Sequence, residues 1–469
     1  MLELLERIIN SANDLLYSYV LIIILVLGGI YFTVRTRFAQ FRLIREQFRS
    51  VTEKGANGGV SSFQALIIST ASRVGTGNII GVATALCIGG FGSVFWMWVI
   101  AIIGAASAFV ESTLAQIYKK RGKDGCFGGP AYYIEAATGK RSIAVIFSVF
   151  LILTYGFGFN MLASYNLQAT FSSYSFYNAN ITPWLIGFAV AALVCYCLMG
   201  GGKRIVSVTS VLVPVMGALY ILVAVVITLL NVTALPGIFK QIFVGAFDLK
   251  AIFGGFGGSC VMQGIKRGLF SNEAGVGSAP NASASAEVSH PAKQGLVQVL
   301  SVFIDTLLVC SATAFLCMTS GVTPPETSSE AATYVQSAFA KSLGSMGPVF
   351  VTVAMILFAF TTLLGNLYYV DKSISYLMGK DPSRRFKNCY YVVASLVILL
   401  GAGLSADLLW GIADITMAGM TLINMPVIIY LGRYAMRALR DYEHKLKDGK
   451  EMTFNKRDID LPHETDYWN

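Results

Sequence analysis

Charged residues are scarce in this chain of 469 residues, since Asp, Glu, Lys and Arg together make up 13% of it. A soluble domain carries about 25% charged residues, so this composition argues against water as the main solvent. Hydrophobic residues make up 55% of the chain, and apolar runs long enough to cross a bilayer recur along it. The composition therefore predicts an all-α protein that crosses a membrane many times.

Catalytic and metal-binding motifs are also lacking. The three histidines, His290, His444 and His463, fall in polar segments, and no HExxH motif or GxSxG motif with partners occurs. The eight cysteines form no CxxC pair with metal spacing, and we expect them to be small core residues. The sequence therefore predicts that this protein is not an enzyme.

Eleven membrane-spanning helices are predicted from the apolar runs. The stretch before the first, MLELLERIIN, has mixed charge and no cleavage site after the apolar run, so we expect an amphipathic helix on the membrane rather than a signal peptide. The predicted spans are residues 15–34, 62–89, 92–116, 142–164, 183–200, 205–231, 250–285, 294–319, 348–371, 388–405 and 408–431.

Basic residues gather in alternate connecting segments, which predicts the orientation of the chain. Because Lys and Arg are retained on the cytoplasmic side, an odd number of spans places the N-terminus outside and the C-terminus in the cytoplasm. The net charge of +9 then reflects topology and not a nucleic-acid partner. The basic tail 433–457 has the charge to bind anionic lipid, but we expect it to be solvated. The basic segments are 35–60, 117–141, 200–204, 266–293, 372–387 and the tail from residue 433.

Two predicted spans are interrupted by residues that break helices. The second span contains Gly75, Thr76, Gly77 and Asn78, and the seventh is broken in the region 254–275. The breaks occupy matching positions in two sets of five spans that cross the membrane in opposite directions. Such paired breaks indicate a transporter site at mid-membrane, although glycines can also simply allow close helix packing.

Unwound backbone at mid-membrane needs ligands, because lipid cannot satisfy its N–H and C=O groups. Free N–H groups suit a carboxylate, so we place a substrate carboxylate at Gly75, Thr76 and Gly77, beside the side-chain carbonyl of Asn78. In the second broken span, we expect Phe256 and Gly257 to line the same pocket.

Several blocks of sequence make the chain recognisable, in the right order along almost its whole length. It resembles the alanine-or-glycine:cation symporter family. The blocks are SRVGTGNIIGVATAL (72–86), GGFGSVFWMWVIAIIG (89–104), GCFGGPAYYIE (125–135), RGLFSNEAGVGSAPNASASA (267–286), HPAKQGL (290–296), FIDT (303–306) and FAFTT (358–362).

The resemblance implies the five-plus-five inverted repeat of the amino-acid and neurotransmitter sodium symporters, with one extra N-terminal helix. We accordingly expect four parts: 1–61, the repeats 62–231 and 232–431, and the cytoplasmic tail 432–469. The implied function is sodium-coupled transport of alanine, glycine or glutamine across the inner membrane by alternating access. We expect the protein to act as a monomer within the lipid bilayer, without nucleic acid.

The resemblance also implies a binding site for the co-transported sodium ion. Carried over by position, it would lie between the backbone carbonyls of Ala71 and Val74 and the hydroxyls of Thr361 and Thr362. The carbonyl of Phe358 would complete the shell.

Two departures from the family pattern bear on the substrate. The family commonly has larger residues at the positions of Ala163 and Asn366. If these positions line the pocket, it is roomier and more polar, which favours glutamine or asparagine over alanine.

Charged residues inside spans are by default paired and functional. We expect Arg73 or Arg267 to pair with Glu273 or Asp305 and to hold a gate or the break, and Glu111 to reach water near the cytoplasmic end of its span. The alternative function is a proton-coupled symporter of the same fold, with Asp305 or Glu273 as the titrating group.

Overall fold

The computed structural model describes residues 9, 11–13, 15–53, 59–122, 125–248, 259–462 and 464–468, and it is mostly helical. Its α-helices are α2 (Ile22–Arg35), α3 (Ala39–Arg42), α4 (Ile44–Val51), α5 (Ser62–Arg73), α6 (Val82–Gly89), α7 (Gly92–Ile117), α8 (Pro130–Thr138), α9 (Arg141–Leu151), α10 (Phe159–Ala169), α11 (Thr182–Leu198), α12 (Gly201–Leu230), α13 (Leu235–Phe247), α15 (Cys260–Asn272), α16 (Pro280–Ser283), α17 (Pro291–Val302), α18 (Ser311–Thr319), α19 (Ala331–Leu343), α20 (Met346–Met378), α21 (Arg384–Gly401) and α22 (Ala406–Lys447).

Short elements complete the fold. The π-helical segments are η1 (Leu16–Leu21), η3 (Gly77–Gly81), η4 (Ile152–Gly158) and η7 (Phe303–Cys310), and the 3₁₀ turns are η5 (Val232–Ala234), η8 (Ser328–Glu330) and η9 (Lys456–Ile459). Strands β1 (Lys120–Gly122) and β2 (Gly125–Phe127) form an antiparallel hairpin, with Arg121 opposite Cys126.

Helices occupy all eleven ranges that the sequence predicts to span the membrane. Among the described residues, six helices are long and apolar enough to cross the membrane. The bent pair formed by α5 and by η3 with α6 makes a seventh candidate span. The π-helical segment η4 joins α9 to α10, and η7 joins α17 to α18, so each pair forms one long span. The prediction of a many-times-crossing helical protein is confirmed, whereas the count of eleven stays a prediction.

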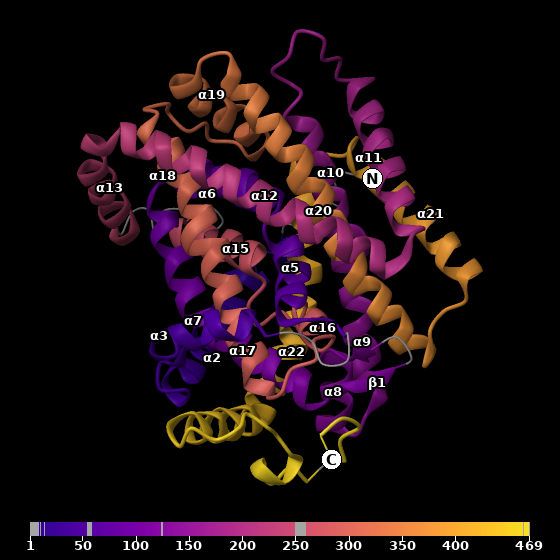
Figure 1. Cartoon of the computed structure of the whole chain (residues 1–469). Helices are drawn as coiled ribbons and strands as arrows, with labels where there is room; N and C mark the ends of the chain where they lie inside the picture. Colours follow the sequence, from indigo (N-terminus) through magenta and orange to yellow (C-terminus); the bar gives the residue numbers. More distant parts are fainter. Residues whose placement is uncertain are drawn as a thin grey trace.

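The long helix α7 packs against α17, α15 and α2, which lie beside it in Figure 1. Small residues allow this packing: a Cβ on Gly264 of α15 would lie 2.5 Å from the backbone oxygen of Ser93, which no real side chain tolerates. A Cβ on Gly268, one turn later, would lie 2.6 Å from the Ile100 side chain and 3.3 Å from Met97 Cα. Glycine therefore brings α15 into backbone contact with α7, as is typical of membrane helix pairs.

Apart from α3, α4 and α8, which lie in the basic connecting segments 35–60 and 117–141, two helices lie in segments that the sequence predicts as loops. These are α13 and α19, and both lie at the end of the molecule opposite the C-terminal segment (Figure 1). At the other end, the chain after α22 folds back across the ends of the helices, and Ile459, Leu461 and Trp468 are buried there. Within the basic tail 433–457 itself, Tyr434, Leu439 and Tyr442 are buried, whereas Arg433, Arg437 and Arg440 are exposed. The expected solvation therefore holds for these arginines and not for the whole segment.

Candidate functional site

The break in the second predicted span is present and sharp. Helix α5 begins at a capping box made by Ser61 and Gln64, and it ends at Arg73. Val74 then adopts an extended conformation, and the axis bends by 52° before the chain resumes at Gly77. An uncharged stretch with two glycines inside an apolar span thus produces the interruption that the sequence predicts.

The break frees two backbone carbonyls. In an unbroken helix Gly75 N–H would bond Ala71 C=O, but it donates to Asn78 Oδ1 instead, at 2.7 Å. Asn78 N–H donates to Gly75 C=O at 3.2 Å, and not to the carbonyl of Val74. Ala71 and Val74 therefore lose their usual helical donors at the position where the sequence predicts a cation.

Helix α20 faces these carbonyls with a polar stripe. Gly365 lies against the backbone of Ser72, where an added Cβ would be 2.7 Å from the amide nitrogen. One turn away, Thr362 is 6% exposed, and its hydroxyl oxygen has no hydrogen-bond partner among the described residues. A Cβ on Gly75 would collide with that hydroxyl. Thr362 Oγ1 is thus a buried oxygen directed at the break and lacking a partner.

Thr361 differs from its neighbour. Its hydroxyl donates to its own helix, with Leu357 C=O at 3.0 Å and Phe358 C=O at 3.2 Å. A hydroxyl that donates its proton in this way keeps lone pairs for a cation. Together, Ala71, Val74 and the two threonines offer neutral oxygens. No cluster of three His, Cys, Asp or Glu occurs in the described ranges, so these residues fit a monovalent ion better than a transition metal.

A small cavity adjoins the break. It measures about 10 Å³, which is room for about one water molecule. An amino acid requires the walls to move apart. The lining residues are Ser72, Arg73, Gly75, Thr76, Gly77, Phe159, Phe270 and Thr362.

Aromatic rings cover one side of this cavity. The rings of Phe159 and Phe270 lie 4.4 Å apart, and Phe270 also contacts Trp410 with its ring 4.8 Å away. The ring of Phe270 approaches Gly77 so closely that a Cβ there would lie 2.7 Å from it. The sequence analysis missed these rings, although Phe270 directly precedes the Ser-Asn-Glu break and was a detectable signal.

In the second broken span, helix α15 ends at Asn272. Glu273 has a φ of 54°, in the left-handed region, and Gly275 follows with a φ of 83°. The carboxylate of Glu273 accepts hydrogen bonds from Ser72 at 3.0 Å and from Ser278 at 2.6 Å. Ser72 also bonds Asn366 Oδ1 at 2.7 Å. Glu273 therefore connects both breaks, and Ser72 is a second residue that the sequence analysis missed.

Asp305 joins the breaks from another direction. It accepts from Asn78 Nδ2 and from Ser271 Oγ, each at 2.7 Å, and from Thr306 Oγ1 at 2.8 Å. Asn78 thus holds Gly75 with its oxygen and Asp305 with its nitrogen. These two hydrogen bonds therefore hold the unwound backbone in place.

The expected pairing of Arg267 with Glu273 or Asp305 is wrong. Arg267 and Lys266 lie within α15, both about 95% buried, and they pair with Asp414 of α22 at 3.3 and 3.9 Å. Lys266 and Arg267 also belong to the segment 266–293, which the basic residues predict to lie in the cytoplasm. That placement is wrong for these two residues, because helix α15 continues to Asn272.

Among the described residues, the guanidinium group of Arg73 forms no ion pair with Glu273 or Asp305. Its Nη1 donates to Gln298 at 2.8 Å, while Nε and Nη2 have no hydrogen-bond partner in the described part of the chain. Arg73 also lines the cavity. Two buried N–H groups at this position suit an anion.

Glu111 is fully buried, so the expectation that it reaches water is wrong. It accepts from Asn424 at 3.0 Å and from the amide of Gly275 at 3.3 Å, which ties α7 and α22 to the second break. The tryptophans Trp96 and Trp98 pack against Phe247 and Phe315.

The other predicted pocket residues have different positions. Ala163 packs in an apolar cluster between α10, α11 and α21, and it is not among the cavity-lining residues. Asn366 is fully buried and bonds Asn160 at 2.9 Å as well as Ser72. Thr76 lines the cavity and accepts from Asn166. Phe256 and Gly257 lie outside the described residues.

Comparison with known proteins agrees with the family resemblance seen in the sequence. The sequence model described as the sodium:alanine symporter family matches residues 2–456. The probable sodium/glutamine symporter GlnT of Bacillus subtilis is 42% identical over 97% of this chain and 94% of its own length. The putative sodium/proton-dependent alanine carrier protein YrbD of the same organism is 40% identical over 98% of this chain and 97% of its own.

Among solved structures, the crystal structure of MhsT in complex with L-phenylalanine has a similar fold. The TM-score is 0.54 at 18% identity, covering 88% of this chain and 94% of MhsT. At that identity the likeness concerns the fold alone.

Proposed function

Because the chain belongs to the sodium:alanine symporter family, we propose that it carries small neutral amino acids into the cell together with sodium. The proposed substrates are alanine, glycine and glutamine, and the proposed mechanism is alternating access. In this arrangement the N-terminus lies outside and the C-terminus in the cytoplasm, as the distribution of basic residues predicts.

The observation that carries the proposal is the buried, partnerless hydroxyl of Thr362 beside two carbonyls that have lost their helical donors. Sodium binds between Ala71 C=O, Val74 C=O and the hydroxyls of Thr361 and Thr362, with Phe358 C=O adjacent. Because these ligands come from both α5 and α20, the ion fastens the broken helix to its neighbour. Sodium then favours the conformation in which the substrate site is formed.

The substrate carboxylate binds the unwound backbone at Thr76 and Gly77, since Gly75 N–H is already used by Asn78. The partnerless N–H groups of Arg73 line the same cavity and supply positive charge. The substrate side chain faces Phe159 and Phe270, which limit its size. The argument for glutamine from Ala163 and Asn366 gains no support, because Ala163 does not line the cavity and Asn366 is occupied by two hydrogen bonds.

Sodium supplies enough energy for accumulation. One charge moving through 100 mV releases about 2.3 kcal/mol. At about 1.4 kcal/mol per tenfold, this supports roughly fortyfold accumulation before any sodium concentration gradient is added.

A proton-coupled symporter is the second candidate. Asp305 is fully buried, and it accepts hydrogen bonds from the neutral side chains of Asn78, Ser271 and Thr306. A carboxylate in such a position can carry a proton across the membrane. The related protein YrbD bears both ions in its name.

Uptake of radiolabelled alanine and glutamine into proteoliposomes tests both candidates. Uptake is expected to need an inward sodium gradient, to stop when choline replaces sodium, and to fall at least about tenfold in Thr361→Ala/Thr362→Ala. The matched control is Thr84→Ala, because Thr84 is buried and bonds only its own helix, at Ile80 C=O. Uptake that ignores sodium and follows an inward proton gradient overturns the sodium site in favour of Asp305.

A further inference from the structure

The C-terminal segment 450–468 crosses the end of the molecule where α7 and α16 end and α17 begins (Figure 1). Its last described residue, Trp468, is 5% exposed, and its indole Nε1 donates to the carbonyl of Gln116 at 2.7 Å. The ammonium group of Lys119 lies 3.8 Å from the ring centre of Tyr467 and 4.8 Å from that of Trp468. These two aromatic residues therefore cover the end of α7.

The end of α7 in turn holds the segment after α16. Gln116 Nε2 donates to Ala286 C=O at 2.9 Å, and Lys119 Nζ donates to the same oxygen at 3.0 Å. Lys119 is fully buried. The position of Ala286 is thus set by two side chains that the tail covers.

Ala286 leads directly to the broken helix. It forms a parallel bridge with Val60, and the amide of Glu287 donates to Val60 C=O at 2.9 Å. Val60 directly precedes Ser61, which caps α5. A continuous set of contacts therefore runs from Trp468 through α7 and Ala286 to the start of the helix whose other end forms the proposed sodium site.

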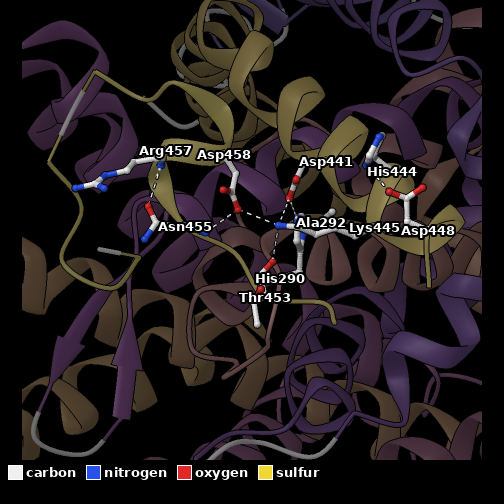
Figure 2. A network of polar contacts seen from close by, with 10 residues as sticks. All are labelled: His290, Ala292, Asp441, His444, Lys445, Asp448, Thr453, Asn455, Arg457 and Asp458. Atoms are coloured by element: carbon white, nitrogen blue, oxygen red, sulfur yellow. Dashed lines mark hydrogen bonds and ion pairs between the residues drawn. The ribbon is translucent and has the colours of Figure 1, made fainter. Parts of the chain in front are cut away.

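A second anchor holds the tail at the start of α17, and Figure 2 shows it around His290. His290 Nδ1 accepts from the amide of Ala292 at 3.1 Å, so in the neutral ring Nε2 carries the proton and donates to Asp441 at 3.1 Å. Burial lowers the pKa of His290, which favours this neutral ring. The ring of Phe454, in the tail, packs edge-on against that of His290, 4.9 Å away.

Lys445 closes the second anchor. Its ammonium group donates to Asp441 at 2.8 Å on α22, and to Asp458 at 2.9 Å and Thr453 C=O at 2.8 Å in the tail (Figure 2). Arg437 adds a bond to Ile459 C=O at 2.9 Å. The tail is thereby fixed to α22 at one end and to α7 at the other.

We propose that this segment is a latch that holds the cytoplasmic side of the transport pathway closed and must release before the site opens inward. The inference rests on the proposed function, since only an alternating-access carrier needs α5 to move away from its cytoplasmic neighbours. The latch acts on the start of α5 and on residues 283–290, because these are the parts that the tail contacts hold together. Its release sets the rate of inward opening.

Hydrogen–deuterium exchange of the full-length protein in lipid nanodiscs tests the latch without any transport measurement. In Trp468→Ala, exchange in residues 59–73 and 278–292 is expected to rise about tenfold, because an indole hydrogen bond and a cation–π contact are lost. In Trp468→Phe, which keeps an aromatic ring but loses the donor, the rise is expected to be smaller. Glu464→Ala, at an exposed tail residue, is the control and should match the wild type.

Uptake and melting measurements separate a latch from a purely structural tail. A latch predicts a higher maximal uptake rate in Trp468→Ala, with the KM for substrate changed less than twofold. It also predicts that Trp468→Phe melts at the same temperature as the wild type. Unchanged exchange in both segments overturns the latch, as does increased exchange throughout the protein with slower uptake. Failure of wild-type uptake would instead count against the proposed function, since the exchange result does not depend on it.

Discussion

Single residues at the first break have requirements that their neighbours do not share. Gly75 is needed because any Cβ would occupy the position of the Thr362 hydroxyl, and Gly365 because α20 touches the backbone of Ser72. Not every glycine in a helix carries such a constraint. Gly217, in the middle of α12, has open space where its Cβ would lie.

The residue-scale prediction concerns Gly75→Ala. The added methyl group displaces Thr362 from the freed carbonyls, so sodium-dependent uptake in proteoliposomes is expected to fall at least about tenfold. Gly217→Ala is the matched control, and it should keep uptake and gain about 0.5–1 kcal/mol of helix stability. Equal uptake by both variants would show that α5 and α20 do not bind the ion together.

At the scale of elements, a buried ion pair joins α15 to α22. Lys266 and Arg267 share Asp414, and the guanidinium group of Arg267 stacks on Trp410 at 3.8 Å from the ring centre. Trp410 in turn contacts Phe270, which lines the cavity. The ion pair therefore positions an aromatic side of the proposed substrate site.

The element-scale prediction concerns Asp414→Asn. Removing this carboxylate leaves Arg267 buried without its counter-charge, which costs up to about 3–5 kcal/mol. The melting temperature in detergent is expected to drop clearly, and substrate affinity to weaken as Trp410 shifts. Asp407→Asn is the control, since Asp407 is exposed on the same helix and bonds Ser328. A melting temperature as high as that of the control would contradict a stabilising role for Asp414.

For the whole molecule, the proposed function implies that sodium stabilises one packed arrangement of helices. Ligands of the ion come from α5 and α20, which lie far apart in the sequence, so binding raises the free energy of unfolding. At a sodium concentration of 100 times Kd the gain is about 2.7 kcal/mol.

Thermal unfolding in sodium chloride and in choline chloride at equal ionic strength measures this gain. The wild type is expected to melt at a higher temperature in sodium. Thr362→Ala is expected to melt at the same temperature in both salts, whereas Thr84→Ala should behave as the wild type. A sodium gain that survives in Thr362→Ala would place the ion elsewhere.

Much of this architecture could be predicted from the sequence, for physical reasons that act locally. Long apolar runs need a bilayer, glycines at 75 and 77 weaken a helix within one, and hydroxyls stand at the consecutive positions 361 and 362 of α20. The ion-pair partners could not be predicted in this way, because Arg267 and Asp414 are 147 positions apart in the sequence. Ala163 shows the same limit, since it packs in an apolar cluster with residues of α11, α20 and α21 and does not line the cavity.

The sequence by itself determined that the chain is helical, lies in a membrane and is broken near residues 75–78, since hydropathy and backbone conformation depend on near neighbours. Only the tertiary structure decided which groups meet across the breaks: Thr362 with Gly75, Glu273 with Ser72, and Lys119 with Tyr467. The burial of Trp468 was likewise decided by the tertiary structure. Such contacts arise from the packing of distant helices, and no local pattern of residues specifies them.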